Sequence, residues 1–308
     1  MPVTEWLFDA VLGAMVLGLA IASLHARTLY GAIVLFITLG LLLSLTWARL
    51  GAPDLALAEA AIGAGLTGTL LFAALGHSGE TSHSPLAPRR KLPALFFALL
   101  VLALLMQALW PLPYGPVVVP QLVQESLPAS GVGHPVTAVL LNFRAWDTLL
   151  ELMVLLLALL GVRQLPATGT ATPAPWPQLL AWSRILAPLT VLLGGYLLWR
   201  GTAAPGGAFQ AGTLLAAGAV MLRLSGVLPP LRWTFWPIRW LVLMGAGLFL
   251  SVATLTAWLG SAWLHYPQPW SAPLIVAIEV AATLSIATTL ALLVVGEKEE
   301  LGSGAANQ

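Results

Sequence analysis

The sequence predicts an all-α, polytopic integral membrane protein, and two features of its composition carry that prediction. Hydrophobic residues make up 59% of the 308 residues and charged residues only 8%, whereas a soluble domain has roughly a quarter of its residues charged. The apolar residues also come in blocks of about twenty, the length that an α-helix needs to cross the hydrocarbon core of a bilayer. Barrel strands would instead show segments of about ten residues with alternating polarity, and the sequence lacks such segments.

About nine transmembrane helices are expected from these apolar blocks. The predicted spans cover residues 5–24, 28–48, 54–75, 92–110, 146–164, 179–199, 206–224, 237–260 and 272–295. Proline opens or precedes four of them, at a position where a helix needs no hydrogen-bonded N–H: Pro53, Pro93, Pro237 and Pro273. The first block has no basic start and carries Glu5 and Asp9, so we interpret it as a retained span and not as a signal peptide.

Long connections separate some of these spans, at residues 76–91, 111–145 and 165–178. The last one, LPATGTATPAPWPQ, is rich in Pro, Thr and Ala and cannot bury enough apolar surface to become ordered. We therefore predict a linker between two domains at residues 165–178, and a disordered tail at residues 298–308.

The basic residues predict the orientation, because cytoplasmic loops carry an excess of Lys and Arg. With the N-terminus outside and the C-terminus cytoplasmic, ten basic residues fall inside and three outside. The cytoplasmic set is Arg27, Arg89, Arg90, Lys91, Arg163, Arg184, Arg223, Arg232, Arg239 and Lys298. The outer set is Arg49, Arg144 and Arg200. We expect a multi-pass protein of the cell (inner) membrane in this orientation.

The composition also excludes several classes of site. The chain has no cysteine, so disulfides and thiolate chemistry are excluded. Its five histidines are scattered without an H-x-x-x-H spacing, and we expect no metal and no cofactor site. A net charge of +1 gives no indication of nucleic-acid binding. No nucleophile motif, HExxH or phosphate loop is present, so a non-catalytic protein is predicted.

Carboxylates inside the predicted spans are the strongest functional signal, because each costs several kcal/mol unless it is protonated, paired or hydrated. The acids at the outer ends or in the outer halves of the spans are Glu5, Asp9, Asp54, Glu59, Asp147, Glu151 and Glu279. Asp147 and Glu151 are four residues apart and therefore share a helix face. Arg144, three residues before Asp147, is placed to neutralise one of them.

Two interpretations of these acids stay open. Asp147 beside Arg144, and Asp54 as a cap of the third span, have an equally good structural explanation as helix-packing elements. For Glu59, Glu151 and Glu279, which have no obvious local partner, we favour a place beside a hydrated ion path, since such carboxylates are the usual material of ion relays.

Small residues predict where helices touch, because glycine lets two backbones approach closely in lipid. The third span contains Gly63, Gly65 and Gly68, and there glycine also permits a π-bulge. The seventh contains Gly206, Gly207, Gly212 and Gly218. Plain close packing is the expectation for most of these glycines. Gln210, in the same span, needs a polar partner inside the bundle.

Three stretches resemble segments of known membrane-complex subunits. Residues 51–72, GAPDLALAEAAIGAGLTGTLLF, resemble the hydrogenase D-subunit-like domain, which also occurs near the carboxyl end of the A subunit of Mrp-type sodium/proton antiporters. Residues 136–162, VTAVLLNFRAWDTLLELMVLLLALLGV, resemble the following segment of that subunit, equivalent to the E subunit of membrane-bound hydrogenases. Residues 183–218, SRILAPLTVLLGGYLLWRGTAAPGGAFQAGTLLAAG, resemble the opening of the Mrp B subunit, and the closing span continues this likeness.

The resemblance implies a division of the chain. It would comprise a D-subunit-like domain of three spans (1–80), an E-subunit-like domain of two spans (81–164), the linker (165–178), an Mrp B-like domain of four spans (179–297) and the tail (298–308). By position, Asp54 and Glu59 match the acids of the first motif, and Arg144, Asp147 and Glu151 match charged residues of the second. The glycine-rich motif of the B subunit falls on Gly206, Gly207, Phe209, Gln210 and Gly212.

The sequence departs from the family pattern at several positions. The B-like motif is usually closer to PGGGFQGG, whereas this chain has Ala208 and Ala211. In the second motif, Asn142, Ala145 and Leu150 replace an Asp and two Gly residues, and the approach to the motif carries His134, Pro135 and Thr137 instead of Asn-rich sequence. The lost carboxylate at Asn142 indicates a divergent member.

The resemblance implies a subunit of a multi-subunit cation/proton antiporter or of an ion-pumping assembly related to the membrane arm of respiratory complex I. Its partners would be large antiporter-like and small helical membrane subunits, the lipid bilayer, and H⁺ with Na⁺ as a second candidate. It would bind no redox cofactor itself. A structural scaffold without an ion path of its own, and a subunit of a redox-driven, hydrogenase-like complex, remain alternatives. A self-sufficient transporter is disfavoured, because the chain shows no internal repeat.

Overall fold

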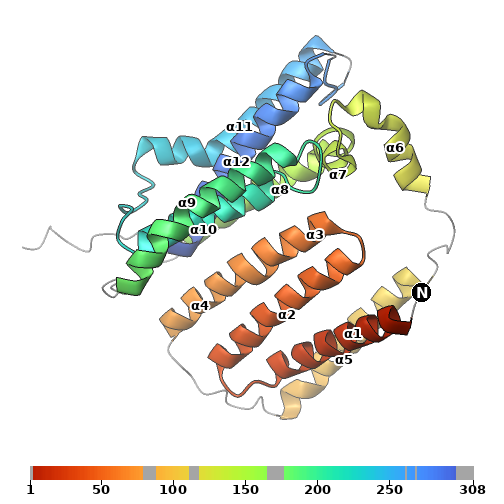
Figure 1. The fold of residues 1–308 in the computed structure, drawn as a ribbon, viewed down its shortest axis with the longest axis vertical. Helices are drawn as coiled ribbons and strands as arrows, with labels where there is room; N and C mark the ends of the chain where they lie inside the picture. Colours follow the sequence, from red (N-terminus) through yellow and green to blue (C-terminus); the bar gives the residue numbers. More distant parts are fainter. Residues whose placement is uncertain are drawn as a thin grey trace, which may run out of the picture.

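The computed structural model describes residues 3–78, 88–110, 118–164, 177–260, 262–267 and 269–295. Every regular element in these segments is helical, which confirms the all-α fold class (Figure 1). Most of the predicted linker and all of the predicted tail (298–308) lie outside the described residues. Only the last two linker positions are described, and they already belong to the helix that begins at Pro177.

The N-terminal group consists of three antiparallel rods. Helices α1 (Val3–Leu24) and α2 (Leu29–Arg49) form the first two. The third is built from α3 (Pro53–Ala58), the π-helix η1 (Glu59–Leu66) and α4 (Thr67–Ser78). Glycines set the packing: a Cβ on Gly40 of α2 would lie 3.0 Å from the Cβ of Ala64 in η1. Arg49 closes one end of α1 and α2 with ion pairs of 2.8 Å to Asp9 and 3.6 Å to Glu5.

The C-terminal bundle consists of α8 (Ala145–Arg163), α9 (Pro177–Arg200), α10 (Ala208–Leu224), α11 (Trp236–Leu259) and α12 (Ser271–Val295). Helix α12 contacts the other four and has more buried residues than any of them. Figure 1 shows the five helices side by side. Close approach again occurs at glycines, where Gly212 of α10 lies against Ile286 and Gly245 of α11 lies against Ser285. Helices α10 and α12 also contact the N-terminal group through η1, α3 and α4.

The segment between the two groups has more structure than the sequence predicted. Helix α5 (Pro88–Leu109) corresponds to the fourth predicted span. Residues 111–145 were expected to form a long connection between two spans, for which no helix was predicted. The described part contains α6 (Val118–Ser130), α7 (Pro135–Ala138) and the π-helix η2 (Val139–Phe143). These helices are too short and too polar to register as apolar blocks, and that is why the composition did not reveal them.

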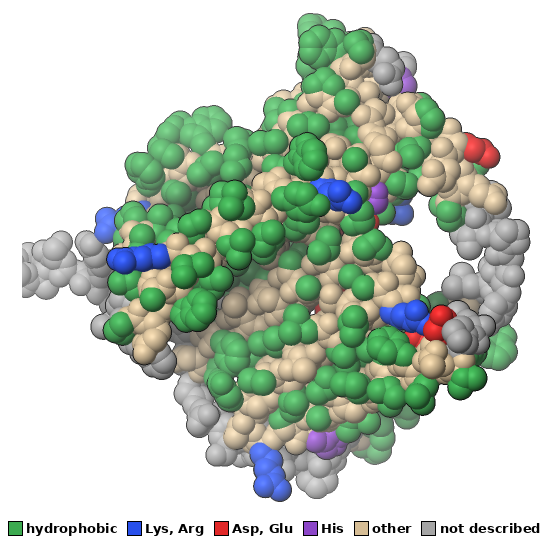
Figure 2. Space-filling model, in the orientation of Figure 1, with side chains coloured by type: hydrophobic (Ala, Val, Ile, Leu, Met, Phe, Trp, Pro, Cys, Tyr) green, Lys and Arg blue, Asp and Glu red, His purple; other side chains and the backbone are tan. Residues whose placement is uncertain are grey.

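Seven of the described helices are long and apolar enough to cross a membrane: Val3–Leu24, Leu29–Arg49, Pro53–Gly76, Ala145–Arg163, Pro177–Arg200, Trp236–Leu259 and Ser271–Val295. Two shorter apolar helices, Leu95–Leu109 and Ala208–Leu224, occupy the remaining predicted spans. Figure 2 shows hydrophobic side chains over most of one face of the molecule, with charged side chains in small separate groups. The chain is therefore a multi-pass membrane protein, while the count of nine spans stays a prediction.

Candidate functional site

A cavity of about 500 Å³ lies where the two helical groups meet. Its walls are mostly aliphatic and come from η1, α8, α10 and α12. The lining residues are Ile62, Leu66, Asp147, Leu150, Glu151, Val154, Leu155, Phe209 and Leu290. Two carboxylates therefore face an otherwise apolar space between elements that are far apart in the sequence.

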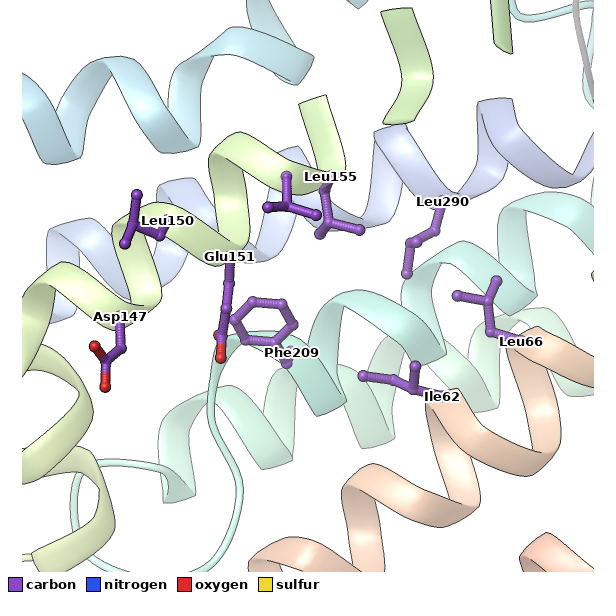
Figure 3. A pocket seen from close by; sticks show the side chains of 9 residues that line it. Ile62, Leu66, Asp147, Leu150, Glu151, Leu155, Phe209 and Leu290 are labelled. Carbon is purple, nitrogen blue, oxygen red and sulfur yellow. The ribbon is translucent and has the colours of Figure 1, made fainter. Parts of the chain in front are cut away.

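The two acids of α8 differ in their partners. Asp147 forms an ion pair of 2.7 Å with Arg144, as the sequence predicted. Glu151, one turn further, extends its carboxylate from α8 toward the ring of Phe209 (Figure 3). Within the described part of the chain, Glu151 makes no ion pair or hydrogen bond. It is thus the acid in this cavity that a mobile ion could neutralise.

Glu59 begins the π-helix, which confirms that this glycine-containing stretch permits a local departure from α-helical geometry. Its carboxylate folds back over Gly63, where a Cβ would collide with it. The side chain is half-buried and belongs to the same segment that supplies Ile62 and Leu66 to the cavity. Since π-helical segments are frequent at functional sites, Glu59 remains a candidate, although it does not line the cavity itself.

Asp54 does not cap the third rod, so that interpretation was wrong. The N-terminal position of α3 is Ala52, and α3 receives no side-chain cap. Instead, one carboxylate oxygen of Asp54 lies 3.0 Å from Nε2 of His134, and the other accepts a hydrogen bond of 3.2 Å from the N–H of Gly206. Asp54 therefore bonds to the N–H of Gly206, 152 residues away in the sequence, and not to the N–H groups at the start of its own helix.

The loop between α9 and α10 also contacts the residues around His134. Thr202 O accepts hydrogen bonds from the N–H groups of Gly133 and His134, and Thr137 donates to Gly201 O. Gly206 (φ 154°) and Gly207 (φ 112°) adopt backbone angles that favour glycine. These two glycines serve a turn and not helix packing, unlike Gly212 and Gly218.

The contacts of His134, before η2, and of Asn142, within η2, explain two departures from the family pattern. His134 contacts the carboxylate of Asp54 through its Nε2 atom. Asn142 donates from Nδ2 to the carbonyl of Ser130 at 2.9 Å, a bond that an aspartate carboxylate cannot donate. The sequence reasoning named both residues as departures but missed their roles. The only local signal was a histidine directly before Pro135, at the start of a helix.

Glu279 lies on the other side of the same loop. It is 2% exposed and lies inside the C-terminal bundle, near the end that this loop covers. Its Oε1 atom approaches the backbone of Gly201 and Gly207. The structure thus places Asp54, His134 and Glu279 around one loop, and Asp147 and Glu151 in the cavity.

Comparisons with known proteins agree with this architecture. Residues 14–80 match the MbhD family, described as the D subunit of MBH, and residues 179–298 match the domain related to the MnhB subunit of the Na⁺/H⁺ antiporter. No curated protein matches the chain. Among solved structures, the Mrp complex from Dietzia sp. DQ12-45-1b contains a similar chain, with a TM-score of 0.74 and 22% identity over 95% of this chain. The membrane-bound sulfane sulfur reductase, an archaeal respiratory membrane complex, contains another, with a TM-score of 0.53 and 22% identity over 68% of this chain.

The fold defines a polytopic helical membrane protein whose N-terminal and C-terminal parts match two separate families of membrane-complex subunits. More particularly, the chain combines an MbhD domain with an MnhB-related domain, which confirms the D-subunit-like and B-subunit-like parts of the resemblance. The E-subunit-like part, at residues 136–162, stays a prediction. It spans 35% of the length of the similar Mrp chain and 99% of the length of the similar reductase chain.

Proposed function

We propose that the chain is a membrane subunit of a multi-subunit cation/proton antiporter or complex-I-like ion-pumping assembly, located in the cell (inner) membrane. The observation that carries this proposal is the cavity in which Glu151, without a protein partner among the described residues, faces elements of both matched domains. A carboxylate at such a junction senses any relative movement of the domains, so it can couple ion binding to conformational change.

The proposed roles follow from the contacts. Glu151 lines the ion path, and Glu59 and Glu279 extend it. The contact of Asp54 with His134 holds together the elements around it, and Asp147 is paired with Arg144 at the start of α8. We keep the division into 1–80, 81–164, 165–178, 179–297 and 298–308 as part of the proposal. The transported ions would be H⁺ and, as a second candidate, Na⁺; any redox chemistry would belong to partner subunits.

The proposal is tested by replacing an ionisable carboxylate with a neutral amide. Glu151→Gln keeps the shape and hydrogen-bonding capacity of the side chain but removes its charge. In membrane vesicles that contain the complete assembly, we expect Glu151→Gln and Glu59→Gln to lose most ion-coupled transport while the subunits still co-purify, and Glu151→Asp to retain part of it.

Glu125→Gln is the matched control, because Glu125 is exposed on α6 and lies outside the cavity. It should transport like the wild type. Undiminished transport in both Glu151→Gln and Glu59→Gln, with normal assembly, would leave the scaffold alternative in place of the ion-path proposal.

A further inference from the structure

The most buried acid of the described chain has no protein partner. Glu279 of α12 is 2% exposed, and within the described residues its carboxylate makes neither a hydrogen bond nor an ion pair. The hydroxyl of Thr283 is directed to the backbone carbonyl of Glu279 and not to the carboxylate. An isolated ionised carboxylate is costly in such surroundings. Its charge is therefore balanced by something other than a described side chain.

A second polar side chain reaches the same place from α10. Gln210 is 9% exposed, and its amide also makes no hydrogen bond to any described residue. Buried amides without partners are uncommon in folded proteins, because each unmade hydrogen bond costs free energy. Two polar groups from different helices, neither with a hydrogen-bond partner among the described residues, thus lie within one largely buried region.

Both side chains converge on the side of Gly207. A Cβ at Gly207 would lie 3.5 Å from Oε1 of Glu279 and 3.8 Å from Oε1 of Gln210, and a Cβ at Gly201 would lie 3.3 Å from the same Glu279 oxygen. At Gly201 that position is filled by the backbone of Gly207, 2.7 Å away, whereas the missing side chain of Gly207 leaves room beside two oxygen atoms. Oxygen donors of this kind suit a small hard cation.

The neighbouring charges are engaged elsewhere. His134 pairs with Asp54 at 3.0 Å on the opposite side of the loop, and the guanidinium of Arg200 lies 5.9 Å from the ring of Tyr196. Among the described side chains, the ionisable residues on helices packed against α12 are Asp147, Glu151, Arg163, Arg184, Tyr196, Arg200, Arg223 and Arg239. Of these described groups, none forms an ion pair with Glu279.

We propose that Glu279 and Gln210, beside Gly201 and Gly207, form a binding site for one small monovalent cation, H⁺ or Na⁺, within the MnhB-related domain. The site is separate from the Glu151 cavity, since neither Glu279 nor Gln210 lines that cavity. The proposal of this site rests on the proposed function at one point, namely that the bound cation belongs to the ion path of the assembly.

Dicyclohexylcarbodiimide tests the site, because this hydrophobic reagent modifies protonated carboxyl groups and a bound cation protects them. Membranes containing the complete assembly are labelled at several pH values, in NaCl or in choline chloride of equal ionic strength. Modification of Glu279 is then measured by mass spectrometry. If Na⁺ is the ligand, labelling should slow about tenfold when Na⁺ is about ten times its dissociation constant. If H⁺ is the ligand, labelling should fall about tenfold per pH unit once the carboxyl is mostly ionised, and NaCl should have no effect.

Gln210→Leu removes the amide oxygen at similar volume and should weaken the Na⁺ protection or shift the midpoint of the pH dependence. Gln124→Leu, an exposed position on α6, is the matched control and should change neither. The wild-type measurement decides the main point even where Gln210→Leu does not assemble.

Labelling that is independent of both pH and Na⁺, or no labelling of Glu279 at all, would overturn the site. Transport is measured on the same membranes. Intact cation-dependent labelling without ion-coupled transport would contradict the proposed function alone, whereas intact transport without cation-dependent labelling would contradict this site alone.

Discussion

At the scale of single residues, the contact between Nε2 of His134 and the carboxylate of Asp54 links the residues before η2 to the third rod of the N-terminal group. Its side chains are 13% and 14% exposed, and Asp54 also accepts a hydrogen bond from the N–H of Gly206. Exposed ion pairs contribute little because water and salt screen them. The Arg144–Asp147 pair, whose side chains are 69% and 41% exposed, belongs to that weaker class. The junction of Asp54 with His134 and Gly206 should therefore contribute more to stability than the Arg144–Asp147 pair.

We predict that Asp54→Ala lowers the stability of the assembly by about 1–3 kcal/mol, because it leaves a shielded N–H and imidazole without an acceptor. His134→Ala should be milder, since Asp54 keeps the N–H of Gly206. The double variant should cost less than the sum of the two single variants, because the residues interact directly. Thermal unfolding of the detergent-purified complex measures each value, and Asp147→Ala, expected within about 1 kcal/mol of the wild type, is the comparison. Strict additivity would show that the contact contributes nothing.

Single residues also show where sequence reasoning ends. The Arg144–Asp147 pair was predictable because both partners lie within one helical turn of each other. The partners of Asp54 were not, because one lies 80 residues away and the other 152 residues away. Spacing rules describe neighbours along a helix, whereas the burial and partners of Glu279 depend on which helices pack together. Its position as a site candidate was predictable, but its surroundings were not.

At the scale of elements, glycines have two different tasks that the sequence alone does not separate. On α10, a Cβ at Gly212 would lie 2.8 Å from Cγ2 of Ile286 and 3.0 Å from the backbone oxygen of Thr283. On α11, a Cβ at Gly247 would meet nothing within 4 Å. Both glycines lie inside apolar helices, so only the packing distinguishes them.

Gly212→Ala should destabilise the contact of α10 with α12 by about 1–3 kcal/mol, because the added methyl group overfills a packed interface. Gly247→Ala is the matched control and should be neutral or stabilise α11 by up to about 1 kcal/mol, since alanine is the better helix former. The melting temperatures of the two purified variants measure the difference. Equal effects of both substitutions would contradict the assignment of Gly212 to the α10–α12 interface.

At the scale of the whole molecule, the fold class and most helix positions followed from block length and composition. Helices α6, α7 and η2 did not, because they are short and mixed in polarity. The contacts between distant segments also agree with the predicted sidedness. Asp54, His134 and the loop of residues 201–207 belong to connections predicted to lie outside, and they meet. On the predicted cytoplasmic side, Arg163 lies 4.7 Å from the ring of Trp233.

The absolute orientation yields the last prediction, and the absence of native cysteine makes it direct to test. Gln124 on α6 is exposed and lies in the predicted outer connection, while Val227, 54% exposed, lies in the predicted cytoplasmic connection between α10 and α11. Gln124→Cys should react with a membrane-impermeant thiol reagent in intact cells, and Val227→Cys should react only after the cells are opened. Ser130, fully buried and hydrogen-bonded to the carbonyls of Leu127 and Val132, is unsuitable for this purpose. The opposite labelling pattern would contradict the predicted topology. Asp54, Glu151 and Glu279 lie toward the same end of the molecule as Gln124, so they would then lie in the cytoplasmic half of the membrane.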